Sequence, residues 1–242
     1  MSEPGKNEQP GSQRIWEVDA VRGFLILCVI VSHSLFYLSY LHRDFIIPPL
    51  VRFVMQYGGA LFIILSGLSA TLGKRSFRRG LFVFLGGMLL TVGSYAAVLM
   101  GILDQGMIIR FGVLHLLGFV MMLYPILKKL PSVILFVFGA VVLAVGYWLT
   151  ISGLRVETHL LFPLGLPYHN FASGDYFPIA PHLGWFCMGI VLGRRLYGQR
   201  RTLFPRVRTN HPVIRFLCFC GRNSLYIFIL HLPILGAVLM LL

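Results

Sequence analysis

Seven apolar stretches, separated by short polar segments, follow one another along most of the chain. Each is about as long as a helix that crosses a lipid bilayer, and they cover roughly residues 23–41, 57–73, 80–100, 111–127, 132–150, 180–197 and 223–242. The pattern predicts an all-α membrane protein, a polytopic bundle of about seven transmembrane helices that forms one domain over residues 14–242. The polar residues 1–13 before it are expected to form a disordered tail.

Composition and charge support this class of protein. Hydrophobic residues make up 57% of the 242 residues and charged residues 12%, a balance that a soluble domain does not need. There are 21 Lys and Arg against 8 Asp and Glu. By the positive-inside rule, the basic segments 74–79, 128–129 and 194–208 are expected in the cytoplasm, which puts the N-terminus inside and the C-terminus outside. No nucleic-acid site is expected, because segment 74–79 is short and lies in a tight loop.

Two segments outside the apolar stretches stand out. Residues 42–56 contain Pro48 and Pro49 followed by a short amphipathic piece, which is expected to lie at the outer interface or to dip back into the membrane. Residues 151–179 form the longest outer loop and are rich in aromatic residues, Pro and Gly. This loop is the expected lid or acceptor surface, since loops carried by a rigid scaffold commonly hold functional residues.

The first apolar stretch carries an ionisable residue at depth. After Asp19 and Arg22, the residues from 23 to 41 contain no Asp, Glu, Lys or Arg, but they include His33. On a helix, Arg22 and His33 share a face and lie roughly 16 Å apart along the axis, which puts His33 near the membrane midplane. An ionisable residue at that depth is by default a functional hypothesis. Asp19 and Arg22 are three residues apart and are expected to pair.

Two further histidines lie inside apolar stretches. His231 is roughly 12 Å into the last stretch, at a depth similar to that of His33, so the two could flank one cavity. His115 lies about one turn inside the fourth stretch. Either could instead be a structural histidine with satisfied hydrogen bonds, and for His115 this interpretation is favoured. No metal is expected, because no two of these histidines are four residues apart and no carboxylate lies within a stretch.

Four motifs in order carry a resemblance to a known family. They are RxxxxDxxRG at residues 14–23 followed by His33, FGVLHLLG at 111–118, DYFPIAPHLGWFCMGIVLG at 175–193 and GRNSLYIFILHLPIL at 221–235. Together they resemble the heparan-alpha-glucosaminide N-acetyltransferase-like family, in its small bacterial branch, within the transmembrane acyltransferase superfamily. The resemblance implies a multi-pass protein of the bacterial inner membrane. It also implies transfer of an acyl group from acyl-CoA, with acetyl-CoA the expected donor, to a hydroxyl or amine acceptor such as a saccharide at the outer face.

The resemblance also suggests roles for individual residues. His33 would be the general base that takes a proton from the acceptor, with Asp19 and His231 as further catalytic residues, and His42 remains a rival base near the outer mouth. Asn223 would stabilise developing oxyanion charge or cap the last helix. Arg22 and Arg222 adjoin the matched motifs, so they are the expected ligands of the donor phosphates. The expected substrate-binding residues are His42, His115 and Asp175, although Asp175 could simply cap a helix.

Several alternatives remain open at the level of sequence. Direct transfer and an acyl-histidine intermediate are both compatible with His33 as the reactive group. The chain is shorter than the heparan-type enzymes, so a homodimer would complete the acceptor site. Membrane lipid is the other expected partner. Instead of an enzyme, the same histidines could serve a transporter of a small solute or proton, or the protein could be a non-catalytic scaffold of the envelope.

Overall fold

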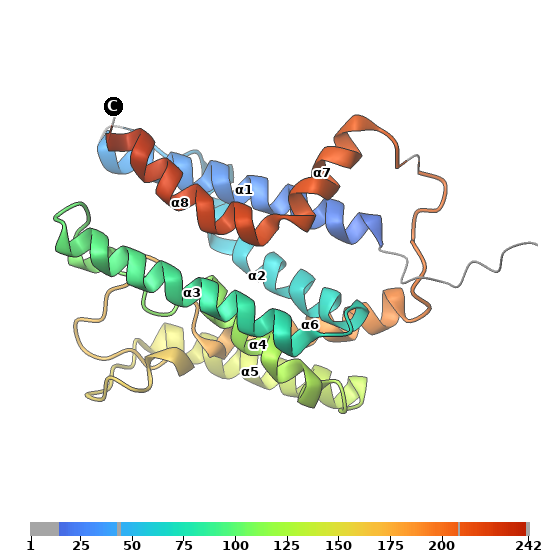
Figure 1. Ribbon diagram of the computed structural model, residues 1–242. Coiled ribbons are helices and arrows are strands. Elements are labelled where there is room, and N and C mark those ends of the chain that lie inside the picture. Colours follow the sequence, from blue (N-terminus) through green and yellow to red (C-terminus); the bar gives the residue numbers. More distant parts are fainter. Residues whose placement is uncertain (1–14, 43–44, 208, 241–242) are drawn as a thin grey trace, which may run out of the picture.

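The computed structural model describes residues 15–42, 45–207 and 209–240, so the tail predicted for residues 1–13 lies outside the described residues. Within the described residues the chain forms eight α-helices and two short 3₁₀ helices (Figure 1). The α-helices are α1 Trp16–Leu41, α2 Pro49–Leu72, α3 Ser76–Leu99, α4 Val113–Leu127, α5 Ser132–Ser152, α6 Ile179–Tyr197, α7 Pro212–Arg222 and α8 Ser224–Met240. The 3₁₀ helices are η1 Gln105–Met107 and η2 Phe162–Leu164.

Seven of these helices overlap the seven apolar stretches, but two boundaries differ. Helix α1 begins at Trp16, so the charged cluster that was expected at the membrane surface is the first part of the same helix. Helix α2 begins at Pro49, and residues 49–56 are its first part rather than a separate segment. Pro49 is the first residue of the helix, a position where its missing N–H costs no intrahelical bond. Helix α2 bends by 41° between Pro49–Met55 and Tyr57–Leu72.

Helix α7 was not predicted. Its 11 residues are strongly amphipathic, since Arg215 and Arg222 share one flank of an otherwise mostly apolar helix. Helix α7 meets α8 at an angle of 80°. Helix α7 packs closely along the first part of α1 (Figure 1). The two helices cross where Gly23 meets Gly221, because a Cβ at either glycine would overlap the backbone of the other helix.

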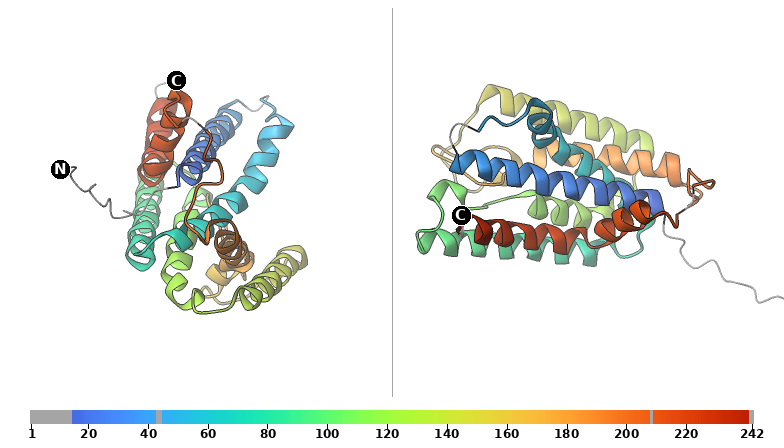
Figure 2. Two further views of the ribbon diagram at one scale, coloured as in Figure 1. Left: turned by 90° about the vertical axis from the view of Figure 1, so that its right-hand side faces the viewer. Right: turned by 90° about the horizontal axis from the view of Figure 1, so that it is seen from above.

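The remaining helices pack in a simple order around one main core. Helix α6 lies between α2 and α5, α3 packs chiefly on α4, and α8 runs beside α1 (Figure 2). Gly67 of α2 and Gly189 of α6 let these two backbones approach closely, as small residues do in membrane helix pairs. Fully buried side chains fill the centre: Ile26, Ile63, Leu116, Val120, Leu135, Phe186, Cys187 and Ile190.

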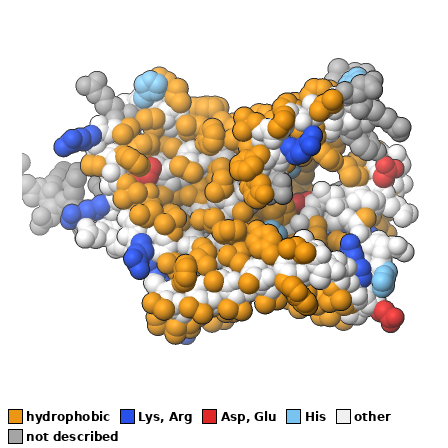
Figure 3. All heavy atoms as spheres, turned by 180° about the vertical axis from the view of Figure 1, so that it is seen from behind, with side chains coloured by type: hydrophobic (Ala, Val, Ile, Leu, Met, Phe, Trp, Pro, Cys, Tyr) orange, Lys and Arg blue, Asp and Glu red, His pale blue; other side chains and the backbone are white. Residues whose placement is uncertain are grey.

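The two ends of the bundle differ in sequence. The loops 73–75 and 128–131 and the loop between α6 and α7 (198–207 and 209–211) lie at one end, where α1 begins, and we call this the basic end (Figure 1). The segments 100–112 and 153–178 lie at the opposite end, which we call the long-loop end. Apolar side chains cover the middle of the face drawn in Figure 3, with charged side chains nearer its two ends. All three loops predicted to share one side of the membrane therefore lie at one end of the molecule.

The helices have the composition of membrane spans. Among the described residues, α1, α3 and α5 are each long and apolar enough to cross a bilayer, and the bent α2 and the α7–α8 pair raise the total to five. Helix α4 is apolar but shorter. These helices support an integral membrane protein, while the total of seven spans and their orientation stay predictions.

Candidate active site

Two histidines meet between the first and last helices. The Nδ1 atom of His33 on α1 lies 2.7 Å from Nε2 of His231 on α8, a hydrogen-bond distance. The imidazole planes are 19° apart, with their centroids separated by 5.0 Å. His231 is buried and His33 is half-buried, and the ring of Phe228 packs against both. The expectation that His33 and His231 lie at similar depth is met, and they are in direct contact.

The surrounding hydrogen bonds set the orientation of this pair. Nδ1 of His231 lies 2.6 Å from the carbonyl oxygen of Phe228. A carbonyl can only accept, so Nδ1 of His231 carries the hydrogen. When both rings are neutral, Nε2 of His231 then holds a lone pair and accepts the N–H of His33 Nδ1. This leaves the lone pair of His33 on Nε2, which makes that atom the proton acceptor of the pair.

Arg22 connects α1 to α2 on the side of the histidine pair that faces the basic end. Its guanidinium forms the expected ion pair with Asp19, with 3.1 Å between Nη1 and Oδ1, and also donates to the hydroxyl of Ser69 on α2. Ser69 in turn donates to the carbonyl oxygen of Leu65. Asp19 and Arg22 therefore hold the start of α1 against α2, on the same helical face as His33.

His115 lies in a different, fully satisfied environment. It is only 2% exposed, and its Nδ1 accepts the backbone N–H of Gly112 at 3.2 Å. Its Nε2 lies 3.2 Å from the hydroxyl of Thr91, and that hydroxyl donates to the carbonyl oxygen of Ile109. Nδ1 thus caps the first turn of α4 and Nε2 links α4 to α3, which supports the structural interpretation of His115.

The structure does not bring the other predicted residues to the pair. The side chain of Asn223 donates to the carbonyl oxygen of Phe219 at the junction of α7 and α8, roughly 12 Å along the helix from His231. His42 is exposed at the end of α1, roughly 14 Å beyond His33. Arg222 is exposed, and its Nε donates to the carbonyl oxygen of Cys218.

Asp175 connects the long loop to α4. Its Oδ2 accepts the backbone N–H of Val113 at 2.8 Å, at the first turn of α4. The expected capping role is therefore present, but on α4 instead of α6. Burial raises the pKa of the Asp175 carboxyl to about 6, although the hydrogen bond from Val113 acts to lower it. Gly112 makes room for this carboxylate, because a Cβ there would overlap it.

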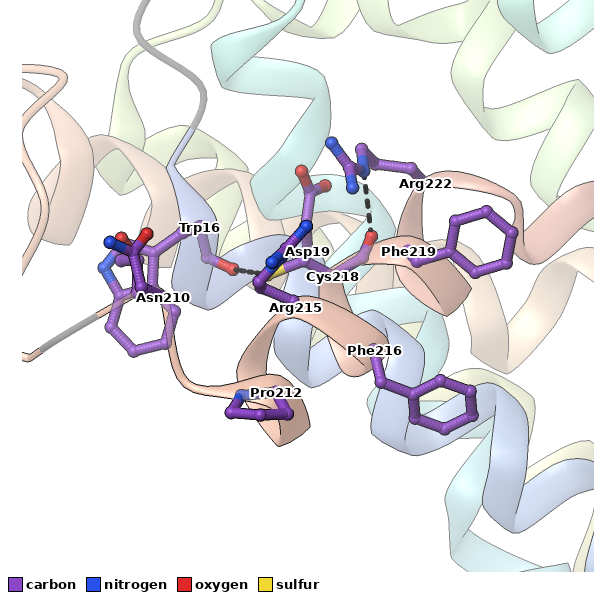
Figure 4. A pocket seen from close by; sticks show the side chains of 10 residues that line it. Trp16, Asp19, Asn210, Pro212, Arg215, Phe216, Cys218, Phe219 and Arg222 are labelled. Atoms are coloured by element: carbon purple, nitrogen blue, oxygen red, sulfur yellow. Dashed lines mark hydrogen bonds between the residues drawn. The ribbon is translucent and has the colours of Figure 1, made fainter.

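Two hollows open near the ends of the bundle. At the basic end, a groove of about 760 Å³ lies between α1 and α7, and we call it the α1–α7 groove (Figure 4). It is lined by Trp16, Asp19, Thr209, Asn210, Pro212, Arg215, Phe216, Cys218, Phe219 and Arg222. At the long-loop end, a hollow of about 450 Å³ lies between α5 and the long loop, beside Phe171 and Tyr176. Neither hollow is lined by His33.

A family model named heparan-alpha-glucosaminide N-acetyltransferase, catalytic, matches residues 14–233. The match spans nearly all of the chain and includes both histidines of the pair. The chain belongs to this family. Comparisons with curated proteins and with solved structures found no match. As a member of the heparan-alpha-glucosaminide N-acetyltransferase catalytic family, the protein is an acetyltransferase-type enzyme, and its long apolar helices make it an integral membrane protein.

The family match also covers a buried carboxylate that the sequence analysis did not single out. Glu17 is 6% exposed at the start of α1, and it accepts the hydroxyl of Thr202 at 2.9 Å and the backbone N–H of Leu203 at 2.7 Å. Glu17 therefore holds the Thr202–Leu203 part of the loop after α6 against α1. In the sequence, Glu17 is only a charged residue ahead of the first apolar stretch, and nothing there indicates that its partner Thr202 lies 185 residues away.

Within the described residues no group of three His, Cys, Asp or Glu could hold a metal ion. The family implies an acetyl donor of the acetyl-CoA type, which would be a substrate of the site. The imidazole pair supplies an oriented proton acceptor for such a reaction.

Proposed function

We propose that the protein is an acyl-CoA-dependent membrane acyltransferase that moves an acetyl group from acetyl-CoA to a hydroxyl or amine acceptor, with His33 as general base. The contact of His33 Nδ1 with His231 Nε2 carries this proposal. It leaves Nε2 of His33 as an oriented lone pair, and a base must be oriented toward the proton that it removes. His231 is the positioning residue, and the carbonyl of Phe228 fixes it in turn.

The transfer balances with these groups. Nε2 of His33 takes the proton of the acceptor O–H or N–H while the acceptor atom attacks the thioester carbon. The C–S bond breaks, the acetyl group joins the acceptor, and the sulfur of CoA leaves as a thiolate that receives the proton from the His33 imidazolium. During the step, the Nδ1–H of His33 keeps its hydrogen bond to Nε2 of His231, and this hydrogen bond stabilises the positive charge of the His33 imidazolium. Direct transfer needs no further nucleophile, so we prefer it to an acyl-histidine intermediate.

The two substrates would reach the pair from opposite ends. We place the basic end in the cytoplasm of a bacterium, because Lys and Arg favour that side of the inner membrane, and the donor enters there beside Arg222. Arg22 supports the site by holding α1 to α2. A saccharide acceptor would approach from the long-loop end, where His42 remains a rival base. A homodimer embedded in membrane lipid would complete the acceptor surface.

Donor binding and turnover test this proposal on the purified protein. Acetyl-CoA at millimolar concentration should raise the melting temperature in detergent, because a ligand that binds only the folded state stabilises it. Glucosamine should then promote release of CoA thiol from acetyl-CoA. Absence of both stabilisation and thiol release in wild-type protein would contradict the proposal and would favour a transporter or scaffold.

A further inference from the structure

The α1–α7 groove is large enough for a small-molecule ligand. Its volume of about 760 Å³ lies within the range of small-molecule pockets. Helix α7 forms one wall and the first turn of α1 the other, and Trp16 and Arg222 lie at opposite sides of the groove with Arg215 between them (Figure 4). The sequence motifs include Trp16, Asp19 and Arg222 of its lining, but the apolar pattern missed helix α7, which forms its main wall.

The lining of the groove suits a phosphorylated ligand that carries an aromatic ring. Arg215 and Arg222 are seven residues apart, so they lie on the same flank of α7, and both are exposed. Arginine is well matched to phosphate oxygens, and an indole such as that of Trp16 is a stacking surface for a planar base. Asp19 also lines the groove, but Arg22 neutralises its charge. The groove therefore keeps a positive balance.

The groove and the imidazole pair lie on the same two helices. Asp19 and His33 are fourteen residues apart on one face of α1, roughly 21 Å along the helix. Arg222 ends α7, and His231 lies seven residues beyond Ser224, the first residue of α8, roughly 10 Å along that helix. A ligand with its phosphates in the groove and a long flexible arm would follow the seam between α1 and α8 toward His33.

We propose that the α1–α7 groove holds the phosphorylated nucleotide of the CoA donor, with Arg215 and Arg222 on its phosphates and Trp16 against its adenine. This inference rests on the proposed function, and it deepens that function by naming the subsite that recognises the donor. CoA carries an adenine ring, a 3′-phosphate and a pyrophosphate at one end of its pantetheine arm and the acyl thioester at the other. The groove thus selects CoA thioesters over shorter acyl donors.

Kinetics with three donors test the groove separately from the chemical step. The donors are acetyl-CoA, its analogue without the 3′-phosphate, and S-acetyl-pantetheine, which lacks the nucleotide. The variant is the double substitution Arg215→Gln with Arg222→Gln. The matched control is Arg75→Gln with Arg78→Gln, which removes two exposed charges at the start of α3, also at the basic end. Melting temperatures confirm that each variant is folded.

The groove variant should raise KM for acetyl-CoA at least about tenfold and leave kcat within about twofold, because the lost contacts are far from the reacting atoms. Its KM for S-acetyl-pantetheine should equal that of wild-type protein, and the control should match wild type with every donor. Removal of the 3′-phosphate should raise KM in wild-type protein and have a smaller effect in the groove variant.

Three outcomes would overturn the inference in distinguishable ways. If wild-type protein turns over acetyl-CoA and the groove variant keeps the wild-type KM, the donor binds elsewhere while the proposed function stands. A variant that keeps this KM but loses stabilisation by phosphatidylglycerol in nanodiscs would identify the groove as a lipid headgroup site. If wild-type protein neither binds nor uses acetyl-CoA, the proposed function fails, and the inference fails with it.

Discussion

The contact between two imidazoles from opposite ends of the sequence gives the protein an oriented base in an apolar bundle. His33 and His231 are 198 residues apart, and their hydrogen bond depends on α8 running beside α1. Each ring has a defined role, because the Phe228 carbonyl determines which nitrogen of His231 carries the hydrogen. A polar pair of this kind would be costly in an apolar interior without its hydrogen bonds.

His231 should act by orienting His33, and two substitutions separate this role from simple packing. In His231→Gln the side-chain oxygen can replace Nε2 as the acceptor for His33. His231→Asn keeps a donor for Phe228 but is too short to reach His33. We expect kcat to fall roughly 10- to 100-fold in His231→Asn, by analogy with the loss of partners that orient a functional histidine, and to be partly restored in His231→Gln. Equal kcat values in the two variants at similar melting temperatures would contradict the positioning role.

Asp175 should make the stability of the protein depend on pH. Its pKa is raised to about 6 from the ordinary 3.8 of an aspartate, so the folded state holds the proton more tightly than the unfolded state. The contribution of Asp175 to the free energy of unfolding is complete below about pH 4. It falls by at most about 3 kcal/mol as the pH rises through 6. The melting temperature of Asp175→Asn, compared with that of wild type at the same pH, should therefore rise between pH 4 and pH 7. Asp104→Asn, at the same end of the molecule, controls for the loss of one negative charge, and parallel melting curves for all three proteins would contradict this assignment.

For single residues, the sequence predicts ion pairs within one helix and the depth of a residue within its apolar stretch. The pairing of Asp19 with Arg22 follows from their spacing, and the similar depth of His33 and His231 follows from counting helical rise. The partner of Asp175 could not be predicted in this way. Its hydrogen bond to Val113 depends on the path of the long loop, and no periodicity determines that path.

Among the helices, the crossing of α1 with α7 determines the shape of the basic end. Gly23 and Gly221 allow the two backbones to touch, and α7 then turns by 80° into α8. The same crossing creates the α1–α7 groove and sets the starting point of the helix that carries His231. A small displacement of α7 would therefore reach both the groove and the imidazole pair.

Gly221→Ala should destabilise the protein by about 1–3 kcal/mol, because the new methyl group would overlap the carbonyl oxygen of Asp19. The matched control is Gly93→Ala on α3, where a Cβ meets nothing within 4 Å and where alanine favours the helix by about 0.5–1 kcal/mol. Melting temperatures in detergent should fall in the first variant and hold or rise in the second. A Gly221→Ala protein as stable as wild type would mean that the helices do not cross so closely.

The apolar pattern located the long helices and missed the short one. The cores of seven helices were predicted because each buries or exposes to lipid a run of apolar side chains. Helix α7 is too short and too charged for that signal. Two features could have revealed it, namely Pro212 at its first position and the spacing of seven between Arg215 and Arg222. Residues 49–56 were separated from α2 because Pro48 and Pro49 suggested a break, whereas Pro49 begins the helix.

At the level of the whole molecule, the distribution of basic loops predicts how the protein sits in its membrane. Single cysteines at Lys74 and Thr158, placed in a variant without Cys28, Cys187, Cys218 and Cys220, would report the two ends. We expect an impermeant maleimide to label position 158 in intact cells and position 74 only after the inner membrane is opened. The positive-inside rule supplies the reason. The reverse pattern of labelling would place the donor groove outside and contradict the proposed path of the donor.

The order in which the helices pack could not be predicted from the sequence. Every apolar stretch has residues suited to a neighbour, and nothing in the pattern says that α6 lies between α2 and α5 or that α3 pairs with α4. Glycines such as Gly67 and Gly189 indicate close packing without naming the partner. The sequence therefore predicts the class of architecture and the depth of each site residue in its apolar stretch. Only the structure shows which residues are in contact.

The rate of CoA release from acetyl-CoA, measured with glucosamine as acceptor in purified wild type, His33→Ala and His42→Ala, tests the central claim most directly. If His33 is the base, His33→Ala should lower the rate at least about a hundredfold, which is typical for the loss of a general base, with little change in KM for acetyl-CoA. His42→Ala, exposed beyond the pair, should stay within about threefold of wild type. A His33→Ala protein that turns over near the wild-type rate, with His42→Ala inactive, would contradict the account and move the chemistry to the outer end of α1.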